Sequence, residues 1–322
     1  MLACRTEAAE LFHVSEPDRV ILTSNATHGL NIAIKSLVPS GGRVVISGYE
    51  HNAVTRPLHG IEGVSVQVVN GRLFEPEQML EGFEKAVTEE TAAVVCNHVS
   101  NVFGYALPVD EIAEICRKRG VPLIVDASQS AGILPVDADG WDAAFVAMPG
   151  HKGLYGPQGT GLLLCGKERT VKTLLEGGTG SLSLQQEMPD FLPDRLEAGT
   201  QNVHGAAGLL EGIRFVRRMG IKVIAEKVHT VVDVLADGLV KTGRYHVFRG
   251  KYAGSVLSVV PLERTPEEMA DRLAERDVAV RSGFHCAPLA HMSGGTLKTG
   301  TLRFSASVFN DTDEAERVLE LL

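Results

Sequence analysis

Hydrophobic and polar residues alternate along residues 19–165 with two different periods. Short runs rich in Val, Ile, Leu and Ala predict strands at 19–24, 43–47, 64–69, 91–99, 121–126, 143–148 and 159–165. Apolar residues three or four positions apart predict helices at 28–38, 75–87 and 109–120, and a further segment at 52–61 separates two strands. This alternation indicates an α/β fold with a mainly parallel, seven-stranded sheet and helices on both faces.

The chain after residue 203 has a different pattern. Long helices are predicted within 203–240, and a smaller α/β region follows, with strands at 246–250, 255–260, 278–283 and 301–307 and a helix at 265–277. We therefore expect a large domain, residues 1–212, and a small C-terminal domain, residues 213–322. Residues 177–202 lack periodicity and are rich in Gly, Pro and polar residues, which is typical of a functional loop.

Composition narrows the class of protein. The 322 residues include 31 Lys and Arg against 40 Asp and Glu, which gives a formal charge of −9. This acidic balance argues against nucleic acid or an anionic membrane surface as the main partner. No apolar run approaches the ~18 residues of a spanning helix, and residues 1–12 resemble an amphipathic helix, not a signal peptide. These features predict a cytoplasmic protein.

The cysteines do not form a recognisable framework. Five of them are scattered without a C-x-x-C pair, which fits neither a disulfide scaffold nor a zinc knuckle. Cys96 and Cys165 lie in predicted strands and should be small core residues. His285, Cys286 and His291 are conceivable metal ligands, but no fourth ligand stands at a recognisable spacing, so we expect no metal site.

Three chemically capable segments follow predicted strands, where parallel sheets bind their ligands. The small and hydroxylated residues of 24–28 can cradle a phosphate at a helix N-terminus or simply cap the helix. Asp126 can pair with a protonated ring nitrogen or a metal, or can cap a helix. Lys152 follows His151 among glycines and suits a Schiff-base amine, although an ordinary surface lysine is the commoner case. Taken singly, each segment leaves both interpretations open.

The joint order of the motifs resembles a known family, the class V, fold-type I pyridoxal-phosphate enzymes. Within it, the chain is most similar to cysteine desulfurases and selenocysteine lyases of the Suf-like group. The matching motifs, in the family's order over nearly the whole chain, are SNATHGLN, EHNAV, HVSNVFG, VDASQ, GHKGLYGPQGTG, RLEAGTQN, RSGFHCAPL and TLRFS. The resemblance implies a fold-type I architecture and pyridoxal 5'-phosphate as cofactor.

The resemblance also implies a cofactor site. Lys152 would hold the cofactor covalently and would then act as the base that moves the substrate Cα proton. Asp126 would keep the pyridine nitrogen protonated, and His51 would stack on the ring and assist proton transfer. Gln129 would hydrogen-bond the phenolic oxygen, with Asn101 near that oxygen or the substrate carboxylate. The phosphate would be held by Ala26, Thr27 and His151.

On the substrate side, the resemblance implies that Arg303 clamps the carboxylate and that Arg281 lies nearby. The Cys286 thiolate, favoured by Arg281 and His285, would attack the substrate sulfur and keep it as a persulfide while alanine leaves. The other interpretation of Cys286 is an unreactive thiol on a mobile loop. Thr200 would reach the phosphate of a neighbouring subunit, which implies a homodimer. A sulfur-acceptor or scaffold protein, in iron–sulfur cluster or cofactor assembly, would take the persulfide sulfur.

Three departures from the family's pattern bear on activity. Pro149 stands where many relatives carry Ser or Thr, so one phosphate contact is lost. His28 stands where relatives often have Glu. The family normally has several dozen residues, with a DNAATT-like segment, before the first helix found here. We therefore expect that Met1 is an internal start and that the chain lacks a segment that helps to close the active site.

Cysteine desulfurase, which converts L-cysteine to L-alanine, is the leading hypothesis. Selenocysteine lyase and cysteine-sulfinate desulfinase are the nearest alternatives, since neither necessarily needs a nucleophilic cysteine. A class V transaminase is less favoured because it has no use for Cys286. A truncated, non-catalytic protein is favoured by the missing segment and by Pro149. It is opposed by the complete set of Lys152, Asp126, His51, Cys286 and Arg303.

Overall fold

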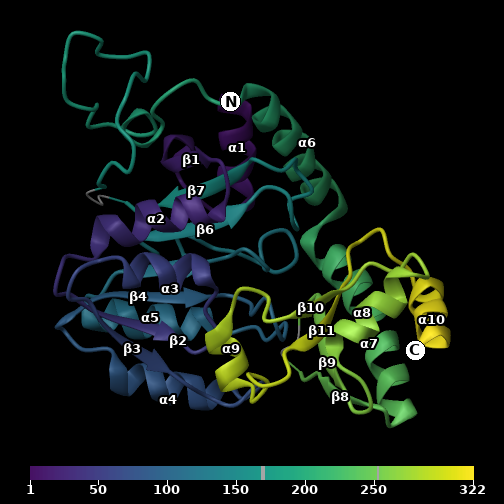
Figure 1. The fold of residues 1–322 in the computed structure, drawn as a ribbon. Helices are drawn as coiled ribbons and strands as arrows, with labels where there is room; N and C mark the ends of the chain where they lie inside the picture. Colours follow the sequence, from purple (N-terminus) through teal and green to yellow (C-terminus); the bar gives the residue numbers. More distant parts are fainter. Residues whose placement is uncertain (168–170, 252–253) are drawn as a thin grey trace.

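Two β-sheets, each covered by helices, make up the structure (Figure 1). The computed structural model describes residues 1–167, 171–251 and 254–322. The larger sheet has seven strands, in the spatial order β1-β7-β6-β5-β4-β2-β3. They are β1 (Val20–Thr23), β2 (Arg43–Ser47), β3 (Ser65–Val69), β4 (Thr91–Asn97), β5 (Leu123–Asp126), β6 (Phe145–Pro149) and β7 (Gly161–Cys165).

The prediction of a mainly parallel, seven-stranded sheet is confirmed. Strands β6, β5, β4, β2 and β3 pair in parallel, whereas β7 runs antiparallel to both of its neighbours, β6 and β1. Strand β1 therefore points in the same direction as the parallel group. The helices that accompany this sheet are α1 (Leu2–Leu11), α2 (Ala26–Leu37), α3 (Asn52–His59), α4 (Pro76–Ala86) and α5 (Val109–Arg119).

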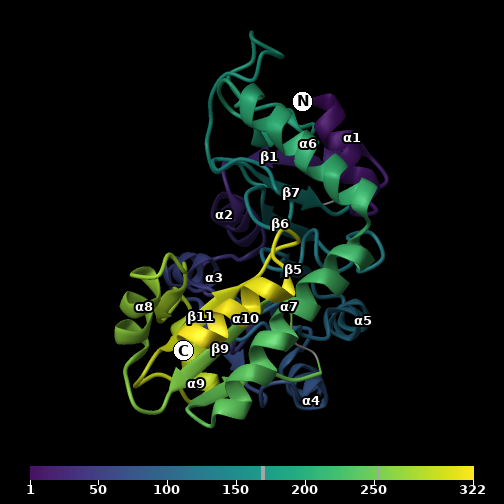
Figure 2. The ribbon, with the colours of Figure 1, turned by 90° about the vertical axis from the view of Figure 1, so that its right-hand side faces the viewer.

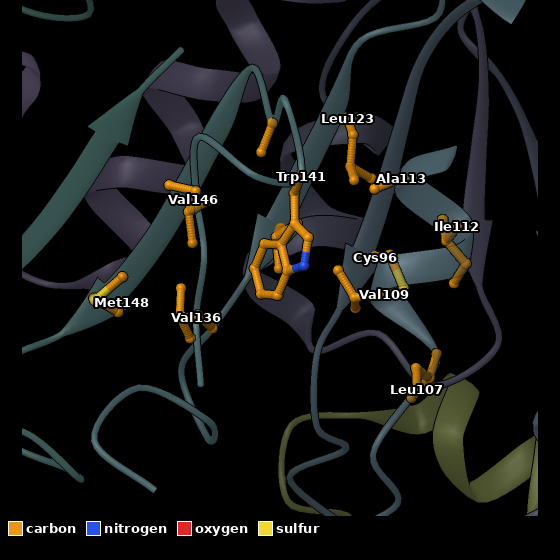
Figure 3. Close-up of a cluster of buried hydrophobic side chains, with 14 of the residues drawn as sticks. Cys96, Leu107, Val109, Ile112, Ala113, Leu123, Val136, Trp141, Val146 and Met148 are labelled. Atoms are coloured by element: carbon orange, nitrogen blue, oxygen red, sulfur yellow. The ribbon is translucent and has the colours of Figure 1, made fainter. Parts of the chain in front are cut away.

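The sheet buries both of its faces because successive strand residues point to opposite sides. In β2, Val44 and Ile46 pack with residues of α2 and α3, while Val45 packs on the other side with residues of α1, α4 and α5. Figure 3 shows the second side, where Trp141 lies among the apolar side chains of β4, β6 and α5. Its indole Nε1 donates to Asp110 Oδ1 at 2.6 Å, so the ring is buried without losing its hydrogen bond.

Two long helices, α6 (Val203–Met219) and α7 (Ile221–Thr242), lead from α1 to the smaller sheet (Figure 2). That sheet is antiparallel, in the order β10-β11-β9-β8. Its strands are β8 (Tyr245–Phe248), β9 (Val256–Pro261), β10 (Arg281–Gly283) and β11 (Thr301–Ser305). Helices α7, α8 (Pro266–Ala274) and α10 (Thr312–Leu321) cover it with a separate apolar core.

Two predictions for this half of the chain need comment. A strand over 278–283 is wrong for 278–280, because Asp277 has a φ of 60° and the Val278 amide still bonds back to Leu273 of α8. The predicted domain boundary at residue 212 lies inside α6. The division into two domains at that residue stays a prediction. In the part of the chain that the structure describes, no helix is both long and apolar enough to cross a bilayer.

Strand β1 is an edge of the larger sheet, and two side chains occupy its free side. The Leu22 amide donates to Glu197 Oε1 at 2.6 Å, and the Val20 carbonyl accepts from Arg5 Nη1. Arg5 and Glu197 also form a buried bidentate ion pair, with N–O distances of 2.7 and 2.6 Å. This pair connects α1 and the segment before α6 to the strand.

Candidate functional site

The carboxyl ends of five strands open on one pocket of about 160 Å³. Because β1, β2, β4, β5 and β6 point in the same direction, the residues that follow them meet at one edge of the sheet. The pocket brings together eight of the residues predicted from the sequence: Ala26, Thr27, His51, Asn101, Asp126, Gln129, His151 and Lys152. Pro149 also lines it, at the end of β6.

Helix α2 presents its N-terminus to this pocket. Asn25 caps the helix, since its side-chain oxygen accepts the His28 amide at 2.9 Å. The amides of Ala26 and Thr27 belong to the first turn, where backbone N–H groups have no partner inside the helix. The capping and phosphate-binding interpretations are therefore compatible, because the cap takes one amide and leaves the others free to bind an anion.

Lys152 and Asp126 both line the pocket, and their charges attract each other. Asp126 is 5% exposed, and its Oδ1 accepts the Ser128 amide at 2.9 Å. Burial lowers the pKa of Lys152, and the charges of Arg303 and Arg281 act in the same direction, while Asp126 opposes them. The Lys152 side chain is exposed to water within the pocket. The protein around the pocket nevertheless removes much of the solvent that would stabilise its charge. An amine with a lowered pKa is easier to deprotonate and suits nucleophilic or base chemistry.

His51 is fixed by the start of α3. Its Nδ1 accepts the Ala53 amide at 3.0 Å, which caps the helix and orients the ring. Burial lowers the pKa of His51, Asp126 opposes the shift, and the charge of Lys152 adds to it. A neutral ring with Nδ1 as acceptor carries its proton on Nε2, so the tautomer follows from the cap.

Cys286 lies on a turn between β10 and α9 (Pro288–Ser293) at the rim of this region. Its carbonyl accepts the Asn52 amide at 2.8 Å, and the His285 carbonyl accepts from Asn101 Nδ2 at 2.8 Å. Both His285 and Cys286 have left-handed backbones, with φ of 49° and 57°. The thiol is exposed, and its Sγ lies 3.8 Å from Arg281 Nη2.

Arg281 and Arg303 are direct cross-strand neighbours on β10 and β11. Arg303 Nη1 donates to the Asn101 carbonyl at 2.8 Å, while its buried Nε has no partner in the described structure. Burial, with the charge of Arg281, lowers the pKa of Arg303 to about 10. Like charges directly opposite each other are unfavourable, so the pair is suited to receive an anion. Arg303 borders an adjoining pocket of about 420 Å³ that shares Lys152.

Two of the predicted residues are placed differently from the rest. His285 is 2% exposed and burial lowers its pKa to about 3, which leaves the ring neutral, so the expected influence of His285 on the Cys286 thiolate stays a prediction. Thr200 does not line the strand-end pocket but a neighbouring one of about 300 Å³. A role for Thr200 toward a second subunit therefore stays a prediction.

Glu50 was missed by the sequence reasoning, although it is the first residue of the EHNAV motif. Its carboxyl is fully buried, and Oε1 accepts the Asn97 amide at 2.8 Å and the Ser47 hydroxyl. Burial raises the pKa of Glu50 to about 8, and the charge of Asp126 adds to this. The available signal was an acidic residue between a buried strand and His51. Among the described residues, no group of three or more His, Cys, Asp or Glu side chains could hold a metal ion.

Comparisons with known proteins agree with this geometry. A probable cysteine desulfurase of Pyrococcus abyssi is 32% identical, with 96% of this chain and 79% of that protein covered. Another, from Methanothermobacter thermautotrophicus, is 33% identical, with 95% and 78% covered. The apo structure of cysteine desulfurase from Thermococcus onnurineus NA1 has a TM-score of 0.91 at 28% identity, over 99% of this chain and 82% of that one. The family model for aminotransferase class-V matches residues 1–318, and the chain therefore belongs to that family.

Proposed function

We propose that this chain is a pyridoxal 5'-phosphate-dependent cysteine desulfurase. It converts L-cysteine to L-alanine and keeps the sulfur as a persulfide on Cys286. One observation carries the proposal: the exposed thiol of Cys286 lies on a turn whose backbone is hydrogen-bonded to Asn101, which lines the pocket of Lys152, and to Asn52, which follows His51. The names of the two relatives, probable cysteine desulfurases, agree with this activity.

The pocket fits the cofactor of the class-V family. Two buried polar atoms have no partner among the described residues: Asn101 Oδ1 in this pocket and Arg303 Nε in the adjoining one, which is typical of a site built for a polar ligand. The α2 amides and His151 would hold the phosphate, Asp126 the ring nitrogen, and Lys152 the aldehyde carbon. When bound, the group supplies an electron sink that stabilises negative charge at Cα and weakens the Cβ–S bond.

The residues of the site divide the remaining work. Arg303 and Arg281 bind the substrate carboxylate, since two adjacent guanidinium groups favour an anion between them. The Lys152 amine, whose pKa is lowered, accepts the Cα proton. The neutral His51, whose imidazole is oriented by the Ala53 amide, carries a proton on Nε2 and would cover the face of the cofactor ring.

Cys286 then takes the sulfur. Its thiolate attacks the substrate sulfur, so that an S–S bond forms and the substrate Cβ–S bond breaks. The electron pair of the broken bond stays on Cβ, which takes up a proton, and Lys152 returns a proton to Cα to give L-alanine. The reaction needs no external reductant, because carbon gains the electrons that sulfur loses. Arg281 Nη2 lies 3.8 Å from Sγ and keeps the attacking sulfur next to the substrate-binding guanidinium groups.

Two partners complete the proposal. A second copy of the chain covers the segment 177–202, where Leu184 is 99% exposed and Phe191 48% exposed. That loop extends beyond the end of the larger sheet (Figure 1). Thr200 of one copy would help to hold the cofactor phosphate bound by the other. A sulfur-acceptor protein removes the outer persulfide sulfur by thiol exchange. We place the reaction in the cytoplasm, where thiols stay reduced.

The test is turnover of L-cysteine with alanine and sulfide both quantified in the presence of a reducing thiol. Equimolar alanine and sulfide are expected, and both should fall at least about 100-fold in Cys286→Ala because attack on sulfur is lost. Undiminished sulfide release from Cys286→Ala would overturn the persulfide step. Selenocysteine and cysteine sulfinate are the control substrates, and keto-acid formation would indicate a transaminase. No turnover of any substrate would favour a non-catalytic protein.

A further inference from the structure

The turn that carries Cys286 is also held by the side chain of the residue before it. His285 Nε2 lies 2.9 Å from the Thr301 hydroxyl on β11, and both side chains are buried. The Thr301 hydroxyl lies 3.2 Å from Ser258 Oγ on β9, which donates to the Val102 carbonyl at 2.6 Å. A chain of hydrogen bonds therefore runs from the turn, through two strands of the smaller sheet, to the loop after β4.

This connection does not act through charge. His285 stays neutral because burial, assisted by the charges of Arg303 and His291, lowers its pKa to about 3. Its ring stacks on His291, with centroids 5.7 Å apart and planes at 29°. The His285 side chain contributes a hydrogen bond to Thr301 and fills buried space beneath the turn.

The turn needs such support. Residues with a β-carbon avoid the left-handed region, yet His285 and Cys286 both occupy it. A strained conformation persists only where its surroundings enforce it. The enforcing contacts are the His285–Thr301 bond, the two backbone bonds to Asn52 and Asn101, and the Ala287 amide to Phe284 carbonyl bond at 2.9 Å.

We propose that His285 is a positioning residue whose hydrogen bond to Thr301 holds the turn in its left-handed conformation and keeps Cys286 Sγ beside Arg281. The kinetic consequence rests on the proposed function, since attack on the substrate sulfur depends on a fixed approach. The structural consequence does not: without the bond, the turn should open more often whatever reaction the protein performs.

Thr301→Val tests the bond, because it removes the hydroxyl and keeps the shape of the side chain. In the holoenzyme, amide hydrogen exchange of the 284–287 peptide should accelerate at least about tenfold, as expected when a local closing contact is lost. Thr301→Ser restores a hydroxyl and should restore slow exchange. Exchange in Thr301→Val that equals wild type would overturn the proposal.

Thr296→Val is the matched control. Thr296 is buried and its hydroxyl lies 2.7 Å from His291 Nδ1, so this variant loses the same kind of bond one histidine away from the turn. Exchange of the 284–287 peptide should stay within about twofold of wild type. Equal acceleration in both variants would show general loosening and would overturn the specific role of His285. If Thr301→Val does not fold, Ser258→Ala removes the next hydroxyl in the chain and should accelerate exchange in the same peptide.

Kinetics separate positioning from thiol chemistry. In Thr301→Val, kcat for alanine formation should fall about tenfold with KM within about twofold, as expected for an interaction used only in the transition state. Iodoacetamide should still alkylate Cys286 at no less than the wild-type rate, and the reaction is selective because the other four cysteines are buried. A parallel fall in alkylation would overturn positioning. If wild type makes no alanine, the proposed function fails while hydrogen exchange still decides the role of His285.

Discussion

The two walls of the site are built by different means. On the larger sheet, each polar side chain follows the end of a regular strand: His51 follows β2, Asp126 ends β5 and Lys152 follows β6. On the opposite wall, Cys286 lies on a strained turn, and Arg281 and Arg303 meet only because β10 pairs with β11. The first wall is positioned by backbone regularity, and the second by contacts between distant segments.

This difference matches a division of chemical work. A proton transfer at Lys152 needs a rigid base at a fixed place, which a strand end supplies. The thiol of Cys286 lies exposed on a short turn. In the proposed function it meets two reactants in turn, the substrate sulfur and then an acceptor. Variants in the two walls should therefore fail in different ways.

The largest expected effect comes from the strand-end wall. Lys152→Ala should reduce alanine formation at least about 10³-fold, because the general base is lost, and should also abolish the absorbance of the covalently bound cofactor. Cys286→Ala should keep that absorbance. The control is Lys167→Ala, an exposed lysine paired with Asp139, which should leave both readouts unchanged. Loss of the cofactor band in Cys286→Ala would contradict the separation of the two walls.

Backbone packing supports the strand-end wall, and Gly132 tests how strongly. A β-carbon at Gly132, where φ is 84°, would lie 2.0 Å from the carbonyl oxygen of Gly153, the residue after Lys152. Gly132→Ala should lower the free energy of unfolding by roughly 3 kcal/mol, measured by urea denaturation. Gly120→Ala is the control: its φ is 65° but nothing lies within 4 Å, so about 1 kcal/mol is expected. Equal losses would mean that the close approach to Gly153 is not limiting.

The second wall should show its effect in substrate affinity. Arg303→Lys keeps the positive charge but loses the bidentate hydrogen bonding of a guanidinium group to a carboxylate. KM for L-cysteine should therefore rise about tenfold, with a smaller change in kcat. Arg281 is more exposed than Arg303, and Arg281→Lys should change KM by about threefold or less. Steady-state kinetics on both variants checks the order. A larger effect at Arg281 would reverse the assignment of the carboxylate clamp.

Glu50 gives the smallest effect and one with a definite pH dependence. Its pKa is about 8 in the folded chain against 4.5 as the ordinary value, so the native state retains a proton that the unfolded state releases. Its contribution to stability is therefore full below pH 4.5 and is lost as pH rises toward 8. Glu50→Gln, which cannot ionise, should raise the melting temperature by a few degrees more at pH 8 than at pH 5. The same shift at both pH values would mean that Glu50 is ionised in the fold.

The same comparison explains what the sequence could predict. The strands and helices were predictable because the spacing of apolar residues is a local property of the sequence, and the strand-end residues follow from the ends of the strands. The family motifs supplied a chemical role for each of these residues, and those roles stay predictions. The opposition of Arg281 and Arg303, the inward orientation of His285 and the burial of Glu50 were not predictable. They depend on strand register and on packing between segments far apart in the chain.

Strand β1 has a consequence for how the chain associates with others. The unpaired backbone groups of an open sheet edge can pair with a further strand, from a second molecule or from a misfolded neighbour. Here Arg5 and Glu197 already occupy the outward carbonyl of Val20 and the outward amide of Leu22. An incoming strand would have to displace both side chains from the hydrogen bonds that they form with β1. The ion pair thus blocks the addition of a strand to β1, and association at this end of the sheet is restricted to surfaces other than the strand edge.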